Sequence, residues 1–139
     1  MPEQCSCHFA EWSGMRPITL LLRQIHPGFV QDGRVTSQAF RPTPKDEFHL
    51  SVDNGDTISP ETAWIRFNDT QSCKSVGVQA VSKAECDMET LRVIADGIPH
   101  PEHCSIDFTG FDRKTIEKKA KYLRSQAEKR GWLLFGCKR

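Results

Sequence analysis

Three histidines beside prolines are the residues best suited to proton transfer. His26 precedes Pro27, whereas His100 and His103 both lie in the segment Pro99-His100-Pro101-Glu102-His103. Imidazole titrates near neutral pH, and loops at strand ends often hold catalytic groups. His26 and His103 are therefore the candidate catalytic residues. The alternative is a rigid surface turn whose imidazoles hydrogen-bond backbone groups.

A second candidate site lies in the segment Gly33-Arg34-Val35-Thr36-Ser37-Gln38. A guanidinium and two hydroxyls beside a permissive glycine can hold a phosphate or a carboxylate through charge-assisted hydrogen bonds. Arg34, Thr36 and Ser37 are accordingly the predicted anion-binding residues. The competing interpretation is an exposed loop whose polar groups are solvated.

Cysteine and histidine side chains also raise the question of a metal. Cys5, Cys7 and His8 fall within four residues, and His100 and His103 could complete a tetrahedral zinc site from another segment. The C-x-C spacing differs from the x2 to x4 spacing of structural zinc sites. We therefore predict no cofactor, with zinc at these five residues as the alternative.

Positive charge is concentrated near the C-terminus. Residues 111–139 hold ten Lys or Arg against three acids, whereas residues 1–110 hold nine against fifteen. Lys114, Lys118, Lys121 and Arg124 could rest along a nucleic-acid backbone. The competing view is that a helix with a narrow apolar stripe must present a charged face to water.

Common catalytic signatures are missing from the sequence. It contains no G-x-S-x-G nucleophile elbow, no Walker loop, no G-x-G-x-x-G turn and no H-E-x-x-H pair. The nucleotide-binding and hydrolase classes that depend on these motifs therefore lose support.

Periodicity and capping residues predict the elements that would position these side chains. Branched and alternating apolar residues predict strands at 18–25, 48–52, 76–81, 91–95, 105–108 and 132–135. Capping signals predict helices that begin at Ser59, at Ser82 and at Asp112. The last helix should bury one stripe, formed by Ile116, Ala120, Leu123 and Ala127.

These elements predict an α+β or α/β fold with a mixed sheet of five or six strands and two or three helices. A chain of 139 residues with 37% hydrophobic residues forms one domain of ordinary size. We expect a single domain over 17–139, preceded by an irregular N-terminal arm over 1–16.

The sequence favours a cytoplasmic protein without a membrane partner. The first residues include Glu3 and Glu11 and lack both the basic and the apolar regions of a signal peptide. The longest aliphatic run, Ile18 to Leu22, is far shorter than a membrane-spanning helix. The six cysteines are therefore expected to be reduced thiols.

Several short motifs carry a resemblance over residues 23–108. They are Arg23, the segment Gly33 to Phe40, Leu50-Ser51-Val52, Gly77-Val78 and Pro101 to Ile106. With these motifs the chain resembles a loose group of small bacterial proteins of unknown function. The resemblance implies a bacterial, cytosolic origin and brings no activity, cofactor or catalytic residue to this chain.

Two functional hypotheses follow. The first is a non-catalytic interaction domain that recognises a protein partner through residues 34–40 and the turn around His103. The alternative is an enzyme acting on a phosphate-containing substrate, a nucleotide or RNA. In that enzyme Arg34 and Ser37 would hold the anion, and His103 or His26 would move protons.

Overall fold

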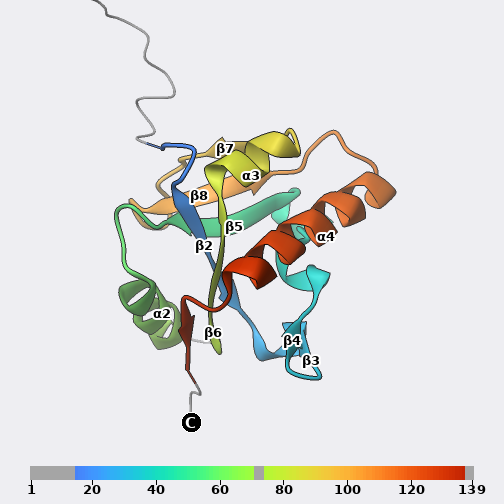
Figure 1. Ribbon diagram of the computed structural model, residues 1–139. Coiled ribbons are helices and arrows are strands. Elements are labelled where there is room, and N and C mark those ends of the chain that lie inside the picture. Colours follow the sequence, from blue (N-terminus) through green and yellow to red (C-terminus); the bar gives the residue numbers. More distant parts are fainter. Residues whose placement is uncertain (1–14, 71–73, 137–139) are drawn as a thin grey trace, which may run out of the picture.

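The computed structural model describes residues 15–70 and 74–136, and this part of the chain has the predicted α+β fold (Figure 1). The main sheet contains β2 (Leu20–Ile25), β5 (His49–Asn54), β6 (Gly77–Ser82), β7 (Arg92–Ile94), β8 (His103–Asp107) and β9 (Leu134–Phe135). A separate small sheet contains β3 (Val30–Gln31) and β4 (Arg34–Val35). The helices are α2 (Pro60–Asp69), α3 (Lys83–Met88) and α4 (Arg113–Arg130).

All pairings of the main sheet are antiparallel, in the order β7-β8-β5-β2-β6-β9. The sheet therefore differs from the mixed sheet expected from the sequence. The reason is the crossover from β5 through α2 to β6. This crossover makes β5 and β6 run parallel to each other, but β2 lies between them and is antiparallel to both.

The three helices begin at the capping residues predicted from the sequence. Ser59 accepts a hydrogen bond from the Thr62 N–H, and Asp112 accepts one from the Thr115 N–H. Ser82 and Glu85 form a reciprocal capping box. These signals are confirmed because a cap satisfies backbone donors within one turn and needs no distant partner.

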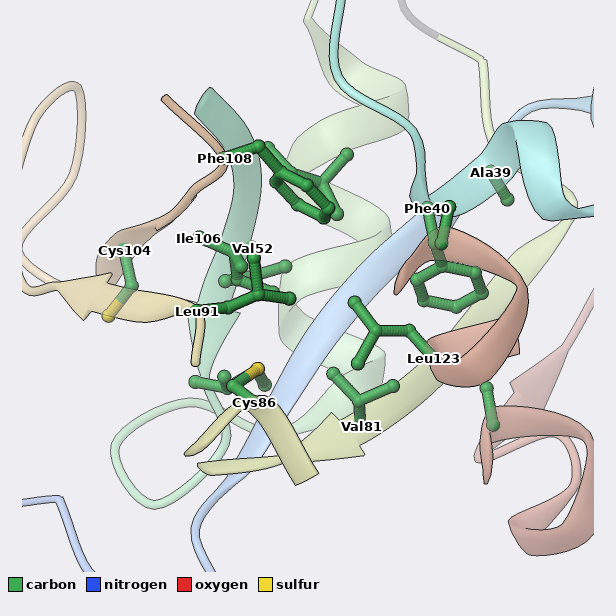
Figure 2. Close-up of a cluster of buried hydrophobic side chains, with 14 of the residues drawn as sticks. Ala39, Phe40, Val52, Val81, Cys86, Leu91, Cys104, Ile106, Phe108 and Leu123 are labelled. Carbon is green, nitrogen blue, oxygen red and sulfur yellow. The ribbon is translucent and has the colours of Figure 1, made fainter. Parts of the chain in front are cut away.

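One face of the sheet packs against α4. Val52, Val81 and Ile106 project from three different strands and meet Phe40 and Leu123 in a buried cluster (Figure 2). The stripe predicted for α4 is confirmed, because the buried residues of that helix are Ile116, Ala120, Leu123 and Ala127.

The opposite face of the sheet is only partly covered. Leu22, Val78 and Ala80 of β2 and β6 pack against Ala63 of α2 in a second, smaller buried cluster. Trp64 anchors the helix, since its indole Nε1–H donates to the Ser75 carbonyl oxygen at 2.8 Å. Because α2 is anchored over β2 and β6, polar side chains of β5 and β8 on the same face line a cleft beside the helix.

Candidate active site

A cleft of about 400 Å³ lies on the α2 side of the sheet, where β5 and β8 extend beyond the helix. Three of the five histidines of the chain line it, together with side chains from β2, β5 and α2. Its principal polar residues are Gln24, His26, Asp53, Arg66, His100 and His103.

Strand pairing brings the central polar groups together. Asp53 of β5 is the register partner of His103 of β8, and Ser51 is the partner of Ser105. Side chains at directly opposed positions project from the same face, with Cβ atoms only about 5 Å apart. The alternation of β5 buries Leu50 on the other face, so the residues at 51 and 53 face the cleft side.

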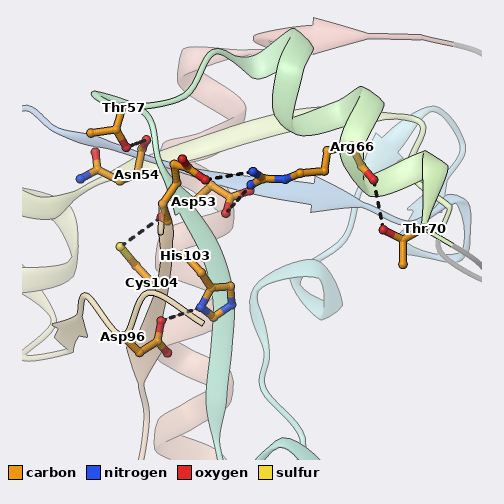
Figure 3. Close-up of polar contacts among 9 residues, drawn as sticks. Asp53, Asn54, Thr57, Arg66, Thr70, Asp96, His103 and Cys104 are labelled. Atoms are coloured by element: carbon orange, nitrogen blue, oxygen red, sulfur yellow. Dashed lines mark hydrogen bonds and ion pairs between the residues drawn. The ribbon is translucent and has the colours of Figure 1, made fainter. Parts of the chain in front are cut away.

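His103 is held by a carboxylate (Figure 3). Its Nδ1 lies 2.6 Å from Oδ1 of Asp96. The other oxygen of Asp96 accepts a hydrogen bond from Ser105 Oγ at 2.7 Å. Burial opposes ionisation of Asp96, but these hydrogen bonds outweigh it and hold the pKa of Asp96 below its usual value. An ionised carboxylate can only accept, so Nδ1 carries the proton and a neutral His103 has its lone pair on Nε2.

His26 is held in the opposite tautomer. Its Nδ1 accepts a hydrogen bond from the backbone N–H of Gly28 at 2.8 Å. That nitrogen is therefore unprotonated, and a neutral His26 carries its proton on Nε2. The ring also makes an edge contact with Phe29, with centroids 5.9 Å apart. In their neutral forms, His103 therefore has an acceptor at Nε2, and His26 has a donor at Nε2.

Asp53 lies between Arg66 and His103 (Figure 3). Its side chain is only 15% exposed, and its Oδ1 is 3.8 Å from Nη2 of Arg66. The other guanidinium nitrogen, Nη1, donates to Glu102 at 2.9 Å. Burial raises the pKa of Asp53, although the nearby charges of Arg66, His103 and His100 partly offset that rise. Asp53 therefore keeps its proton to higher pH than an exposed aspartate.

Gln24 of β2 is also part of the cleft wall. Both polar atoms of its amide are shielded from solvent, and neither has a hydrogen-bond partner within the described parts of the chain. Buried amides are nearly always hydrogen-bonded, and the exceptions call for an explanation. An unpaired amide in the cleft wall lowers the stability of the folded protein.

The described cysteines do not take part in this site. Cys104 follows His103 but points to the opposite face of β8, into the core beneath α4. Burial raises the pKa of Cys104 to about 11 and that of Cys86 to about 12. Both of these described thiols are free, and both are protonated at neutral pH.

The anion-binding residues expected from the sequence do not line this cleft. Arg34 forms a two-pronged ion pair with Glu128 of α4, at 2.9 and 3.1 Å. Thr36 and Ser37 stay in the same segment, at the start of the 3-10 helix Ser37–Phe40 that packs against α4. This segment is held there because Val35, Ala39 and Phe40 are buried in the cluster beneath α4. The structure therefore brings His26, His100 and His103 together and leaves Arg34 apart from them.

The proposed zinc ligands are divided. Cys5, Cys7 and His8 lie outside the described residues, whereas His100 and His103 line the cleft. Within residues 15–70 and 74–136 no three His, Cys, Asp or Glu side chains are grouped so as to hold a metal ion. Zinc at these residues stays the untested alternative to the prediction of no cofactor.

The candidate nucleic-acid residues lie on α4. Lys114, Lys118 and Lys121 are exposed on that helix. Arg124 is instead engaged, because it donates to the Val35 carbonyl oxygen at 2.9 Å and lies 3.5 Å from Glu128. Nucleic-acid binding along this helix is a prediction that the contacts neither support nor oppose.

Sequence reasoning missed Asp53, Asp96 and Arg66. A signal for the first was present, because Ser51 and Asp53 alternate with the apolar Leu50 and Val52 and so mark a strand with one polar face. The other two come from a loop after β7 and from the middle of α2. Only the fold brings them to the same cleft.

Comparison of the chain with models of protein families, with curated proteins and with solved structures found no significant match. The resemblance to small bacterial proteins therefore stays a prediction. In the described ranges no helix is long and apolar enough to cross a membrane.

Proposed function

We propose that the protein is an enzyme that uses acid–base catalysis to cleave a phosphate ester in the cleft containing His103. The observation that carries this proposal is the hydrogen bond between Asp96 and His103, which orients the imidazole and leaves Nε2 for the substrate. A carboxylate that fixes the tautomer of a histidine is a recurrent arrangement in general-base catalysis.

The residues divide into complementary roles. His103 Nε2 takes the proton of the attacking hydroxyl as its oxygen forms a bond to phosphorus. The bond from phosphorus to the leaving oxygen breaks, and that oxygen receives the proton of Asp53 in its acid form. His26 Nε2–H donates a hydrogen bond to a phosphoryl oxygen.

Charge supports a phosphate-containing substrate. Arg23, Arg66 and Lys74 line the cleft, and Asp53 is the single Asp or Glu among the described side chains that line it. The Arg66 guanidinium is held at the cleft wall by two carboxylates, since Nη1 donates to Glu102 at 2.9 Å and Nη2 lies 3.8 Å from Asp53. A guanidinium is well suited to bind two phosphoryl oxygens at once. In this proposal Arg66 takes the role that the sequence suggested for Arg34.

The interaction-domain hypothesis is less well supported by the contacts. Its proposed surface includes residues 34–40, but Val35, Ala39 and Phe40 are buried and Arg34 is paired with Glu128. The cleft, by contrast, holds several polar groups in a geometry that acid–base chemistry can use. We therefore favour the enzyme, and partner recognition stays an untested prediction.

The first test uses bis(4-nitrophenyl) phosphate and uridine 2′,3′-cyclic phosphate as substrates. We expect turnover of at least one of them, with kcat reduced about 100-fold or more in His103→Ala and His103→Gln. His26→Ala should lower kcat less, because it removes one hydrogen bond and no proton transfer. Melting temperatures close to that of the wild type would show that the variants are folded. No turnover of either ester by the folded wild-type protein would refute the proposal.

A further inference from the structure

A second cleft, of about 750 Å³, lies on the α4 side of the sheet, beside β5. It is lined by residues of the segment 41–48, by the start of α4 and by β5. Arg23, Phe29 and Ser51 line both clefts. The two clefts therefore share these three side chains as part of their walls.

The strands β2 and β5 separate beside the shared residues. Their pairing is confined to Leu21 with Asn54 and Leu22 with Asp53, after which the remaining residues of β2 pair only with β6. Arg23 spans the gap, donating from Nε to the Ala39 carbonyl oxygen at 2.7 Å and from Nη1 to the Ser51 carbonyl oxygen at 3.0 Å. The Arg23 side chain thus lies between the two clefts and lines both.

The second cleft is positively charged. Arg23, Arg41 and Arg113 line it, against the single carboxylate of Glu117 among its described lining residues. Glu117 accepts from Arg41 at 3.2 Å and from Arg113 at 3.3 Å, so one acid is shared between two guanidinium groups. The excess charge suits a ligand that carries further phosphates beyond the reacting one.

Half-buried aromatic rings accompany these cations. Phe29 lines both clefts, and Phe48 lines the second. Phe48 has a φ of 63° and follows Glu47, with a φ of 56°, so two successive residues adopt the left-handed conformation. Bulky residues rarely do so, and such backbone strain is concentrated at functional sites. Aromatic rings beside cations are the usual platform for unpaired nucleobases.

We propose that the substrate is single-stranded RNA, whose backbone runs from the second cleft past Arg23 to His103. This inference rests on the proposed function and names its substrate. RNA fits because its own 2′-hydroxyl supplies the nucleophile, so the enzyme needs only a base, an acid and cations. An unpaired strand fits because its bases can leave the stack and rest on Phe29 and Phe48.

The reaction is a transesterification. His103 Nε2 takes the proton of the 2′-hydroxyl, and the 2′-oxygen forms a bond to the adjacent phosphorus. The bond from phosphorus to the 5′-oxygen breaks, and that oxygen takes the proton of Asp53. The products are a 2′,3′-cyclic phosphate and a 5′-hydroxyl, and the proton on His103 returns to Asp53 through solvent.

The test uses a short single-stranded oligoribonucleotide that contains all four bases, with the same sequence in DNA as a control. We expect cleavage of the RNA to a 2′,3′-cyclic phosphate, loss of cleavage in His103→Ala, and no cleavage of the DNA. The double variant Arg41→Gln/Arg113→Gln should raise KM for RNA about tenfold at unchanged kcat. It should leave KM for bis(4-nitrophenyl) phosphate unaltered, because a small ester reaches only the first cleft.

A matched control removes two charges elsewhere. Arg92 is 77% exposed on β7, and Lys129 is exposed near the end of α4. Neither residue lines the cleft containing His103 or the second cleft. Arg92→Gln/Lys129→Gln should leave KM for RNA within twofold of the wild type, on the order of the effect of ordinary surface substitutions. If KM for RNA rises instead in Lys118→Gln/Lys121→Gln, RNA binds to the exposed face of α4 and not in the second cleft. That result would overturn the assignment.

Failure of this inference can be told apart from failure of the proposed function. Turnover of a small ester that depends on His103, without cleavage of RNA, would overturn the substrate and leave the acid–base site standing. No turnover of any probe would overturn both. Cleavage of RNA that persists in His103→Ala would come from another nuclease and would also count against the inference.

Discussion

His26 and His103 line one cleft, yet their Nδ1 atoms make opposite kinds of hydrogen bond. His103 Nδ1 donates to the Asp96 carboxylate at 2.6 Å, whereas His26 Nδ1 accepts from the Gly28 N–H at 2.8 Å. The two neutral rings consequently present a bare Nε2 and an Nε2–H to the same space. This pairing gives the cleft a proton acceptor and a hydrogen-bond donor without any further change in the protein.

The first prediction concerns the orientation of His103. Asp96→Ala removes the acceptor for Nδ1–H, so the ring should populate both tautomers and kcat should fall about tenfold or more. The ¹⁵N chemical shifts of the ring report the tautomer directly, and a purely structural role for Asp96 would not change them. Ser105→Ala, which keeps the contact between Asp96 and His103, is the matched control. A single Nδ1–H tautomer in Asp96→Ala would contradict this account.

The second prediction is a dependence of stability on pH. Because burial raises the pKa of Asp53 in the folded protein, ionising this group costs free energy as the pH rises through that raised pKa. Asp53→Asn should therefore unfold at a higher temperature than the wild type at pH 7, with a gain on the order of 1 kcal/mol. The gain should vanish below about pH 3.9, where aspartate is protonated in both states. Thermal unfolding at several pH values measures it, and a gain independent of pH would rule out the mechanism.

The third prediction concerns the unpaired amide of Gln24. Two buried polar atoms without partners lower stability, so Gln24→Leu should raise the free energy of unfolding by about 1 kcal/mol. Gln38→Leu, at an exposed position, should change it by less than about 0.5 kcal/mol. Denaturant unfolding compares the two variants. A loss of stability in Gln24→Leu would mean that the amide is satisfied in solution.

The fourth prediction tests how the last strand is attached. A Cβ added to Gly77 would collide with the Leu134 carbonyl oxygen and lie 2.9 Å from the Trp132 ring, so Gly77→Ala should cost about 2 kcal/mol. Gly33 has a φ of +78° but open space around it, so Gly33→Ala should cost only about 1 kcal/mol of backbone strain. Equal losses in the two variants would contradict the close packing of β6 against β9.

The elements of the fold were largely predictable because their signals are local. Ser59, the capping box at Ser82 and Asp112 each satisfy backbone donors within a few residues, and the apolar stripe of α4 is visible in the sequence alone. Strand order was not predictable, since it depends on a crossover that places β2 between β5 and β6.

The candidate site was predictable only in part, because most of its residues are brought together by strand pairing and helix packing. His26 and His103 were visible as titratable residues in proline-rich turns. Their partners Asp53, Asp96 and Arg66 are ordinary surface residue types until β5 pairs with β8 and α2 is anchored over β2 and β6. Arg34 was a misleading signal, because the fold places it beside Glu128 of α4, apart from the histidines, and buries its neighbours in the core.

The central claim is that His103 is the general base, and chemical rescue tests it most directly. In His103→Ala the space vacated by the ring opens onto the cleft, so added imidazole can enter and take the proton in its place. We expect imidazole to restore turnover of bis(4-nitrophenyl) phosphate in a saturable manner, and to restore none in His103→Gln, whose side chain fills the space. Wild-type rates in His103→Ala, or an equal response of both variants to imidazole, would contradict the account.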